Sequence, residues 1–578
     1  MSAAPSVGSA DAAGATGEAR GFGAAGAAGA GGSAGSSSSV GAESVPSSVH
    51  ALIEEAARRW PTAPYALDAE GRHTLDFATL ARSAAAVQRR LRDLGSKPGD
   101  TVSLVMPNGL ATLQLLLGAM HGGWCVNPVN LLSQPDAMRY VLEHSDCRVV
   151  CASPEWEAPV RALLPALGRE VALVVVDPAR PLDWADDDSA GASPRLPLSP
   201  PSPSSPVPPA STEAPLPPAA DALALLMYTS GTTGRPKGVM LTQANLAANA
   251  QAISAEHGLG AGDRVLGVLP LYHINAFAVT MLAPLAHGGS VVLPPRFSAT
   301  QFWSQAIGHG CTWINVVPTM IAFLLETAAR EGAPPREQLA RIRFCRSASS
   351  ALAPEHHRAF EATFGIGIVE TMGLTETVAP SFSNPLDPAR RKIGSVGRAS
   401  GCEARIIGPD LQPLPDGETG ELAIRGPNVM RGYYKNADAT AAAFTPDGWL
   451  RTGDLGHRDS DGFFFVTGRI KELIIKGGEN IAPREIDEAL LAHPAVLEAA
   501  AVGLPDPRYG QEILACVVLR DGMPADAAAE AACRAELLAH CERHLGRYKT
   551  PKELRFVAEL PRGPSGKVQR LKLLEGNG

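Results

Sequence analysis

The strongest constraint on this chain is a ten-residue segment that combines hydroxyl side chains, three glycines and one lysine: Thr229-Ser230-Gly231-Thr232-Thr233-Gly234-Arg235-Pro236-Lys237-Gly238. It follows an apolar run at residues 222–228 that is typical of a buried strand. The residues after it predict a short strand and then a helix that begins near Thr242. Glycines let backbone N–H groups approach an anion closely, while hydroxyls and a lysine supply further donors. The segment therefore predicts a phosphate-binding loop.

The order of residues in this loop differs from a Walker A motif, which needs Gly-Lys-Ser/Thr where this chain has Arg235-Pro236-Lys237-Gly238. A plain flexible loop is the alternative interpretation. The loop resembles, almost residue for residue, the signature of the AMP-forming adenylating superfamily, which includes acyl-CoA synthetases, luciferases and carrier-loading adenylation domains. The resemblance implies that the loop holds ATP through Thr229, Ser230, Gly231, Thr232, Thr233, Gly234 and Lys237.

Composition narrows the classes of protein to which the chain can belong. A chain of 578 residues with 45% hydrophobic residues is long enough for more than one domain. Its net charge of −8 gives no general attraction to nucleic acid, and the sequence has no signal peptide and no apolar run long enough to span a membrane. Nine cysteines without a C-x-x-C pair fit a reducing compartment, so we expect a cytoplasmic protein.

Changes in composition along the chain predict its organisation. Residues 1–44 are rich in Gly, Ala and Ser and predict a disordered tail. Residues 45–469 predict a large N-terminal domain, and residues 470–578 predict a small C-terminal domain. A Pro/Ser-rich stretch at residues 188–219 predicts an extended surface insertion, with a linker between domains as the alternative.

Periodicity of apolar residues predicts an α/β fold. Residues 49–60 and 77–94 have helical spacing, residues 101–106 predict a strand, and strands and helices alternate onward in layers. The C-terminal part predicts a small α+β unit, with strands at residues 473–475, 499–502 and 514–519 and helices at 483–491 and 526–544. Asp526 is the expected N-cap of the second helix.

The resemblance covers residues 48–574 and implies an activity. The family joins a carboxylate to ATP, releases pyrophosphate, and passes the acyl group of the adenylate to a thiol. In Met372-Gly373-Leu374-Thr375-Glu376, the resemblance implies that Thr375 meets the α-phosphate and that Glu376 carries Mg²⁺, which suits a carboxylate beside phosphate oxygens. Met372 stands where an adenine-stacking tyrosine is common. A helix cap is the alternative role for Thr375 and Glu376.

Three further segments complete the nucleotide site implied by the resemblance. The small-residue turn that reads adenine corresponds to Ser349, Ser350 and Ala351. The ribose-binding carboxylate corresponds to Asp454, which can accept from both ribose hydroxyls. Arg469 is expected to reach the same ribose, and Lys471 falls at the hinge between the domains. Each of these turns also has an ordinary structural interpretation.

Near the C-terminus, the resemblance implies two segments that act in turn. Lys567 corresponds to the catalytic lysine, whose ammonium would bridge the carboxylate of the acid and the α-phosphate. Lys476, Gly477 and Gly478 correspond to a segment that lines the pantetheine tunnel of CoA-using members after the small domain rotates. A tight turn before the helix at Pro483 is the structural interpretation of the two glycines.

The acid pocket is the least specified part of the site. His273 corresponds to the aromatic gate beside the carboxylate, although a packed core histidine is the alternative. Ile274, Asn275, Thr371 and Val378 are expected to shape the remainder of the pocket. The stretch at residues 346–397 looks most like synthetases that act on small or medium acids, including oxalate.

The sequence therefore predicts an AMP-forming acyl-CoA synthetase that uses ATP, Mg²⁺ and CoA on a small or medium carboxylic acid. An adenylating enzyme that loads a separate carrier protein is the nearest alternative, and the Gly477-Gly478 segment favours CoA over a carrier. A catalytically silent nucleotide-binding protein is a third possibility. Retention of Lys237, Glu376 and Lys567 argues against that possibility.

Overall fold

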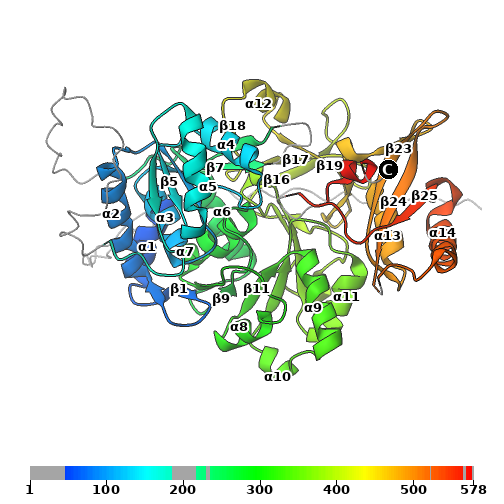
Figure 1. Ribbon diagram of the computed structural model, residues 1–578, viewed down its shortest axis with the longest axis horizontal. Helices are drawn as coiled ribbons and strands as arrows, with labels where there is room; N and C mark the ends of the chain where they lie inside the picture. The colour runs from blue at the N-terminus through cyan, green and yellow to red at the C-terminus, as the bar shows by residue number, and fades with distance from the viewer. Residues whose placement is uncertain (1–45, 185–215, 230–234, 521, 564–567, 576–578) are drawn as a thin grey trace, which may run out of the picture. The chain divides into compact units, whose positions relative to one another are not determined.

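The computed structural model describes residues 46–184, 216–229, 235–520, 522–563 and 568–575 (Figure 1). The architecture is α/β, with a large N-terminal domain and a smaller C-terminal domain, as the sequence predicts. The tail at residues 1–44 and most of the Pro/Ser-rich stretch lie outside the described residues, so those two predictions stay predictions.

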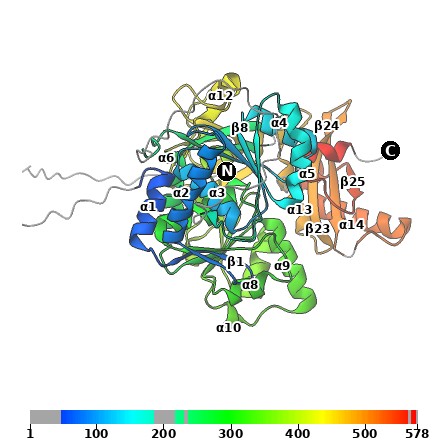
Figure 2. The same ribbon diagram turned by 60° about the vertical axis from the view of Figure 1, so that its left-hand side comes forward.

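One sheet carries the strands that flank the predicted phosphate loop. Its central strands are parallel, and side chains alternate between two apolar clusters, so both faces are covered. Helices α1 (Val49–Arg59), α2 (Phe77–Asp93) and α3 (Leu110–His121) lie on one side, and α4 (Pro135–His144) and α5 (Pro154–Leu163) lie on the other (Figure 2). In spatial order, the strands within the described residues are β18 (Gly432–Tyr433), β8 (Lys237–Thr242), β7 (Leu223–Thr229), β4 (Cys125–Pro128), β3 (Thr101–Val105), β5 (Val149–Ala152) and β6 (Ala172–Val175).

A second sheet has helix layers on both faces. Five of its neighbouring strands, β13, β12, β11, β9 and β10 in spatial order, run parallel. One face packs on α8 (Phe302–Gly308), α9 (Pro318–Glu331) and α11 (Pro354–Phe364). The opposite face shares its apolar cluster with α6 (Gln243–Glu256), the π-helix η3 (Ala276–Leu282) and α7 (Ala283–His287). In spatial order, the strands within the described residues are β15 (Arg398–Ala399), β14 (Phe382–Ser383), β13 (Ile368–Met372), β12 (Phe344–Ser347), β11 (Trp313–Val316), β9 (Arg264–Leu266), β10 (Ser290–Leu293), β1 (Pro64–Asp68) and β2 (Thr74–Asp76).

An antiparallel sheet leads from these two layers to the C-terminal domain. Its last hairpin, formed by β19 and β20, pairs Asp454 with Arg469. A short helix, α12 (Ala437–Ala443), precedes β19. The strands described here are β16 (Glu403–Ile407), β17 (Gly420–Arg425), β19 (Leu450–Arg458) and β20 (Phe464–Arg469).

The C-terminal domain has one sheet whose inner face packs on helices α13 (Pro483–Leu491) and α14 (Ala527–Lys549). Asp526 caps α14 as predicted, because its side chain accepts a hydrogen bond of 2.8 Å from the backbone N–H of Ala529. The helix extends past the predicted end, although Gly546 interrupts it with a φ of 74°. The described strands are β22 (Glu479–Ile481), β21 (Ile474–Lys476), β24 (Gly510–Leu519), β23 (Val496–Asp506) and β25 (Glu553–Phe556).

Local sequence accounts for the helix boundaries near the predicted phosphate loop. The strand predicted at residues 222–228 is β7, and the next strand and helix are β8 and α6. Thr242 begins α6 through a capping box, in which its hydroxyl accepts from Asn245 N–H and the Asn245 side chain accepts in return. Among the described helices, none has the length and apolar character that crossing a membrane requires.

Candidate active site

The predicted phosphate loop follows one strand of the first sheet and precedes its antiparallel neighbour. Thr229 ends β7, Lys237 begins β8, and the two residues are partners across the ladder. The predicted loop residues Ser230, Gly231, Thr232, Thr233 and Gly234 lie outside the described residues. Lys237 Nζ lies 4.2 Å from the centroid of the Tyr433 ring. This cation–π contact fixes the ammonium close to the ends of the loop.

Tyr433 also connects Lys237 to the predicted magnesium residue. The Tyr433 hydroxyl donates a hydrogen bond of 2.9 Å to Glu376 Oε1. Glu376 and Thr375 belong to the short 3₁₀-helix η4 (Thr375–Thr377), and the Met430 N–H donates to the Glu376 carbonyl at 2.8 Å. Thr375 and Glu376 are therefore inside this helix and do not act as its N-cap. The fold places a lysine over the face of the Tyr433 ring and a carboxylate at its hydroxyl.

The two residues expected at the ribose form a direct ion pair. Arg469 Nε lies 2.7 Å from Asp454 Oδ1, where β19 and β20 pair. The Asp454 carboxylate raises the pKa of Arg469, and Asp454 itself is 3% exposed. The structure thus brings together the two groups that the sequence placed at the ribose.

A turn after β12 carries the residues expected to read adenine. Ser349 has a φ of 76°, which is uncommon for a residue with a side chain. Its hydroxyl accepts a hydrogen bond of 3.2 Å from Asn275 Nδ2. Ser350 and Ala351 follow and are exposed. Met372 ends β13 and packs at the edge of the apolar cluster around Phe382.

The predicted gate lies at the start of the π-helix η3. The His273 ring contacts the Tyr272 ring with centroids 4.8 Å apart, and the His273 carbonyl accepts from the Phe277 N–H. Asn275, two residues later, is buried among polar groups. A π-helix widens the backbone by one residue per turn and is often found at functional sites. His273 and Asn275 therefore lie just before this π-helix, and Asn275 contacts the adenine-side residue Ser349.

A polar cluster behind Asn275 was not predicted from the sequence. Arg346 Nη1 donates to Asn275 Oδ1 at 2.7 Å and to Asn315 Oδ1 at 2.8 Å. Arg346 is completely buried in β12. The available signal was an arginine that directly follows two apolar residues in this four-residue strand. Tyr433 was also missed, because nothing in its local sequence indicates contact with Lys237 or Glu376.

The segment expected to meet CoA forms a tight hairpin in the C-terminal domain. Lys476 pairs with Glu479, so Gly477 and Gly478 make a two-residue turn with φ of 56° and 90°. Positive φ at both positions favours glycine in a turn of this kind. A Cβ on Gly478 would meet no atom within 4 Å, whereas one on Gly477 would lie 3.0 Å from the Tyr548 hydroxyl. The turn geometry accounts for both glycines, and the space beside the Gly478 Cα is unoccupied by protein atoms.

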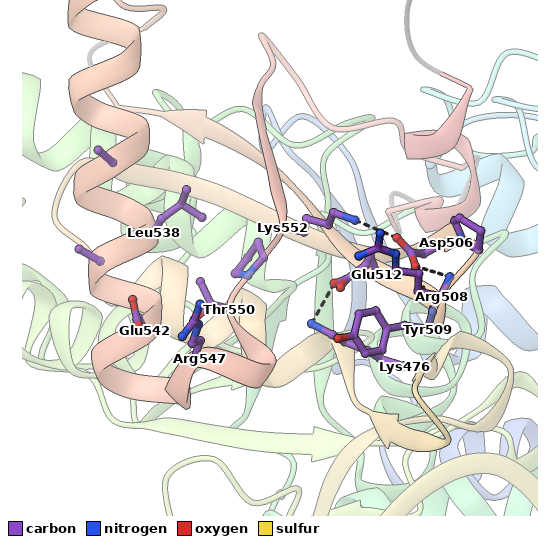
Figure 3. Close-up of a pocket in the computed structure, with 14 residues that line it drawn as sticks. Lys476, Asp506, Arg508, Tyr509, Glu512, Leu538, Glu542, Arg547, Thr550 and Lys552 are labelled. Carbon is purple, nitrogen blue, oxygen red and sulfur yellow. Dashed lines mark hydrogen bonds and ion pairs between the residues drawn. The ribbon is translucent and has the colours of Figure 1, made fainter.

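Lys476 lies beneath this hairpin and does not extend into solvent. Its Nζ lies 2.9 Å from Glu512 Oε2 and donates to the Tyr548 carbonyl at 2.9 Å. The pair lines a depression in the C-terminal domain, together with Arg508, Lys552 and other residues (Figure 3). The volume of this depression is ≈ 920 Å³. Of the predicted site residues that the structure describes, Lys476 lines this depression. The predicted catalytic residue Lys567 lies outside the described residues.

Comparison with known proteins identifies the family. A profile described as AMP-binding enzyme matches residues 53–434, and one described as AMP-binding enzyme C-terminal domain matches residues 485–567. The chain belongs to the AMP-binding enzyme family. Among curated relatives of this AMP-binding enzyme, a sulfoacetate–CoA ligase of Cupriavidus necator is 58% identical over 91% of this chain and 97% of that protein. An oxalate–CoA ligase of Arabidopsis thaliana is 35% identical over 90% of this chain and 97% of that protein.

Solved structures agree with this assignment of the AMP-binding enzyme. A benzoate CoA ligase of Burkholderia xenovorans matches with a TM-score of 0.76 and 28% identity over 91% of this chain and 99% of that chain. An o-succinylbenzoate CoA synthetase of Bacillus subtilis, in complex with its acyl-adenylate, has the same TM-score of 0.76 and 28% identity, over 91% and 98% of the two chains. The chain is thus an AMP-forming acyl-CoA synthetase, an acid–thiol ligase that uses ATP, CoA and a small acid.

Proposed function

We propose that this synthetase activates a short acid, with sulfoacetate as the first candidate and oxalate as the second. The observation that carries the proposal is the 58% identity to a sulfoacetate–CoA ligase over 91% of this chain. In the proposed reaction, a carboxylate oxygen of the acid attacks the α-phosphorus of ATP and pyrophosphate leaves. The thiolate of CoA then attacks the acyl carbon, and AMP leaves.

Mg²⁺ is proposed to bind at Glu376. The residue fits the ion, because a carboxylate beside the hydroxyl of Thr375 offers the oxygen ligands that Mg²⁺ prefers. When bound, the ion neutralises charge on the pyrophosphate that leaves. Tyr433 orients the Glu376 carboxylate through its hydroxyl, and Lys237 directs a second positive charge to the phosphate loop. Asp454 accepts from the ribose hydroxyls while Arg469 holds its carboxylate in place.

The two half-reactions are proposed to use two orientations of the C-terminal domain. The domain boundary lies near residue 470, and Lys471 in the 3₁₀-helix η6 (Ile470–Glu472) is the proposed hinge. Lys567 serves adenylation, and the open turn at Gly477 and Gly478 admits pantetheine. Nine unpaired cysteines support a reducing, cytoplasmic location.

Pyrophosphate release from MgATP tests this function with a panel of short, dicarboxylic, medium-chain and aromatic acids, each with and without CoA. We expect multiple turnover with sulfoacetate when CoA is present. Release that is indifferent to CoA would favour loading of a separate carrier protein. No release with any acid would contradict the proposed function.

A Lys567→Ala variant tests the role of the proposed catalytic lysine. Loss of its charge should slow acid-dependent pyrophosphate release by about 100-fold or more, because one preorganised charge contact is lost at the transition state. Thiolysis of chemically made acyl-AMP should remain within a few-fold of the native rate. Unchanged pyrophosphate release would remove Lys567 from the mechanism.

A further inference from the structure

Arg346 is a buried cation for which the described chain supplies no carboxylate. It occupies the middle of β12, between β11 and β13, and is 0% exposed. Burial of an arginine is costly unless an anion and hydrogen bonds compensate for lost water. Among the described residues, no Asp or Glu forms an ion pair with Arg346. Its hydrogen-bond partners there are two neutral amides.

The hydrogen bonds of Arg346 occupy only one part of the guanidinium. Nη1 donates to the Oδ1 atoms of Asn275 and Asn315, at 2.7 and 2.8 Å. Nε and Nη2 are buried and have no hydrogen-bond partner among the described residues. These two nitrogens form the side-on edge of a guanidinium, whose parallel N–H groups match two oxygens of a carboxylate or sulfonate. The edge suited to an oxyanion is therefore the unpaired one.

The Arg346 guanidinium lies next to a residue expected in the acid pocket, because its Nη1 donates to Asn275. Asn275 accepts from Arg346 and also donates to Ser349, in the turn expected to read adenine. Asn275 is two residues after the gate residue His273, at the start of η3. The side chains of Phe344 and Arg346 lie on the same face of β12, since successive side chains alternate along a strand. That face is the one shared with α6 and η3.

We propose that Arg346 binds a second anionic group of the acid, a sulfonate or a carboxylate, at the end of the pocket away from the reacting carboxylate. The inference rests on the proposed function and adds the residue that selects the acid. A short acid with two anionic groups presents one group to ATP and the other to the side-on edge of Arg346. A monoanionic acid of the same size leaves that edge unpaired and is discriminated against.

The charge of Arg346 persists under the conditions of the reaction. Burial lowers the pKa of the guanidinium to about 9, which keeps it protonated at neutral pH. Because the side chain is closed to solvent, an anion reaches it only when a neighbouring side chain moves. Asn275 contacts both Arg346 and the Ser349 turn. Its hydrogen bonds with Ser349 and Asn315, at 3.2 and 3.3 Å, are long. Rotation of this amide would release Nη1 and let the guanidinium turn its Nε and Nη2 edge toward an entering anion.

A purely structural role for Arg346, in holding the two asparagines, makes a different prediction for substrates. Removal of a structural arginine impairs all acids alike. Removal of an anion receptor impairs acids with two anionic groups and spares the others. Paired substrates that differ in this one charge therefore separate the two roles.

The test compares kcat/KM for sulfoacetate with that for methylsulfonylacetate, a monoanionic analogue whose sulfone is uncharged, and kcat/KM for malonate with that for propanoate. The variants are Arg346→Met and Arg346→Lys. Arg343→Met is the matched control, because Arg343 precedes the same strand but pairs with Asp263 at 2.7 Å. We expect Arg346→Met to lower kcat/KM for the dianionic acids by about 100-fold and for the monoanionic acids by less than about 5-fold. Arg346→Lys should recover part of this loss through KM, since it keeps the charge but not the side-on edge. Arg343→Met should leave unchanged the ratio of kcat/KM for the dianionic acid to kcat/KM for the monoanionic acid.

Equal losses for both classes of acid, or no loss for the dianions, would overturn the proposal. If the native enzyme releases pyrophosphate with none of these acids, the proposed function fails but the anion site remains testable. In that case, calorimetry measures the binding of sulfoacetate in the presence of a non-hydrolysable ATP analogue and tests the anion site directly. Binding that Arg346→Met abolishes, while methylsulfonylacetate binds neither protein, supports the site. Equal binding to the native protein and Arg346→Met, or no binding of sulfoacetate to the native protein, rejects it.

Discussion

Two buried cations, Lys476 in the C-terminal domain and Arg346 in the second sheet, have opposite surroundings. Lys476 is 7% exposed and lies 2.9 Å from the buried carboxylate of Glu512. Arg346 is 0% exposed and contacts two neutral amides. The fold supplies the counter-charge of Lys476, so this lysine stabilises the hairpin that presents Gly477 and Gly478. The fold supplies none for Arg346 within the described residues, so its counter-charge is expected from a ligand.

The largest expected effect is on the stability of the C-terminal domain. Lys476→Met leaves the Glu512 carboxylate buried without its cation and should lower the free energy of unfolding by about 3–5 kcal/mol. Arg346→Met removes a desolvated charge together with two hydrogen bonds, and these effects oppose each other. It should change stability by less than about 2 kcal/mol. Hydrogen–deuterium exchange measures the change in stability for each variant. In each sample, exchange in strands β21 to β24 is compared with exchange in strands β11 to β13.

A double variant, Lys476→Met with Glu512→Leu, sharpens this comparison. Removal of both charges should restore most of the stability that Lys476→Met loses, because no buried charge remains unpaired. A loss from Arg346→Met as large as that from Lys476→Met would break the comparison. It would mean that the asparagine cluster is as important for folding as the Lys476 pair.

The next effect concerns acid stability near Arg346. Burial, with a smaller contribution from the charge of Arg346, lowers the pKa of His257 to about 3. His257 is therefore neutral in the folded protein, while its unfolded pKa is about 6.5. As pH falls below 6.5, the unfolded state binds the extra proton, so the free energy of unfolding should fall by about 1.4 kcal/mol per pH unit for this residue. Full stability is present above pH 6.5.

Urea denaturation at pH 7 and pH 5 checks this expectation. Trp313, whose ring stacks on Phe344 at 5.6 Å, reports unfolding of this region by fluorescence. His257→Gln should lose much less stability between the two pH values than the native protein does. Arg346→Met should raise the pKa of His257 and thus lessen its acid sensitivity. Parallel losses in all three proteins would show that other groups control the acid response.

The smallest effect separates the two roles of the hairpin glycines. Gly478→Ala places a side chain at a φ of 90° and should cost about 1 kcal/mol of stability. Gly462→Ala is the matched control, because Gly462 has a φ of 81° and also meets no atom within 4 Å. If the turn admits pantetheine, Gly478→Ala should also slow CoA-dependent release of product several-fold, with pyrophosphate release in the first turnover unchanged. Equal behaviour of the two variants would assign the glycines to the turn alone.

Much of the fold was predictable from the sequence, because local signals determine local structure. The helices that begin at Val49, Phe77 and Pro483 and the strands around the phosphate loop follow from apolar spacing and capping residues. Ends of elements were less predictable, as in α14, which continues to Lys549 through an interruption at Gly546. The order of strands in the sheets was not predictable, since it depends on contacts between distant segments.

The sequence by itself determined the chemical class of this protein. The residues predicted to bind nucleotide lie in short contiguous motifs, because a loop that holds phosphate needs its glycines, hydroxyls and lysine at fixed spacing. Only the tertiary structure decided which distant groups meet. Tyr433 contacts both Lys237 and Glu376, and Arg346 reaches Asn275 across 71 residues of sequence. Whether a buried charge has a partner depends on three-dimensional packing, so the contrast between Lys476 and Arg346 emerges only in the folded chain.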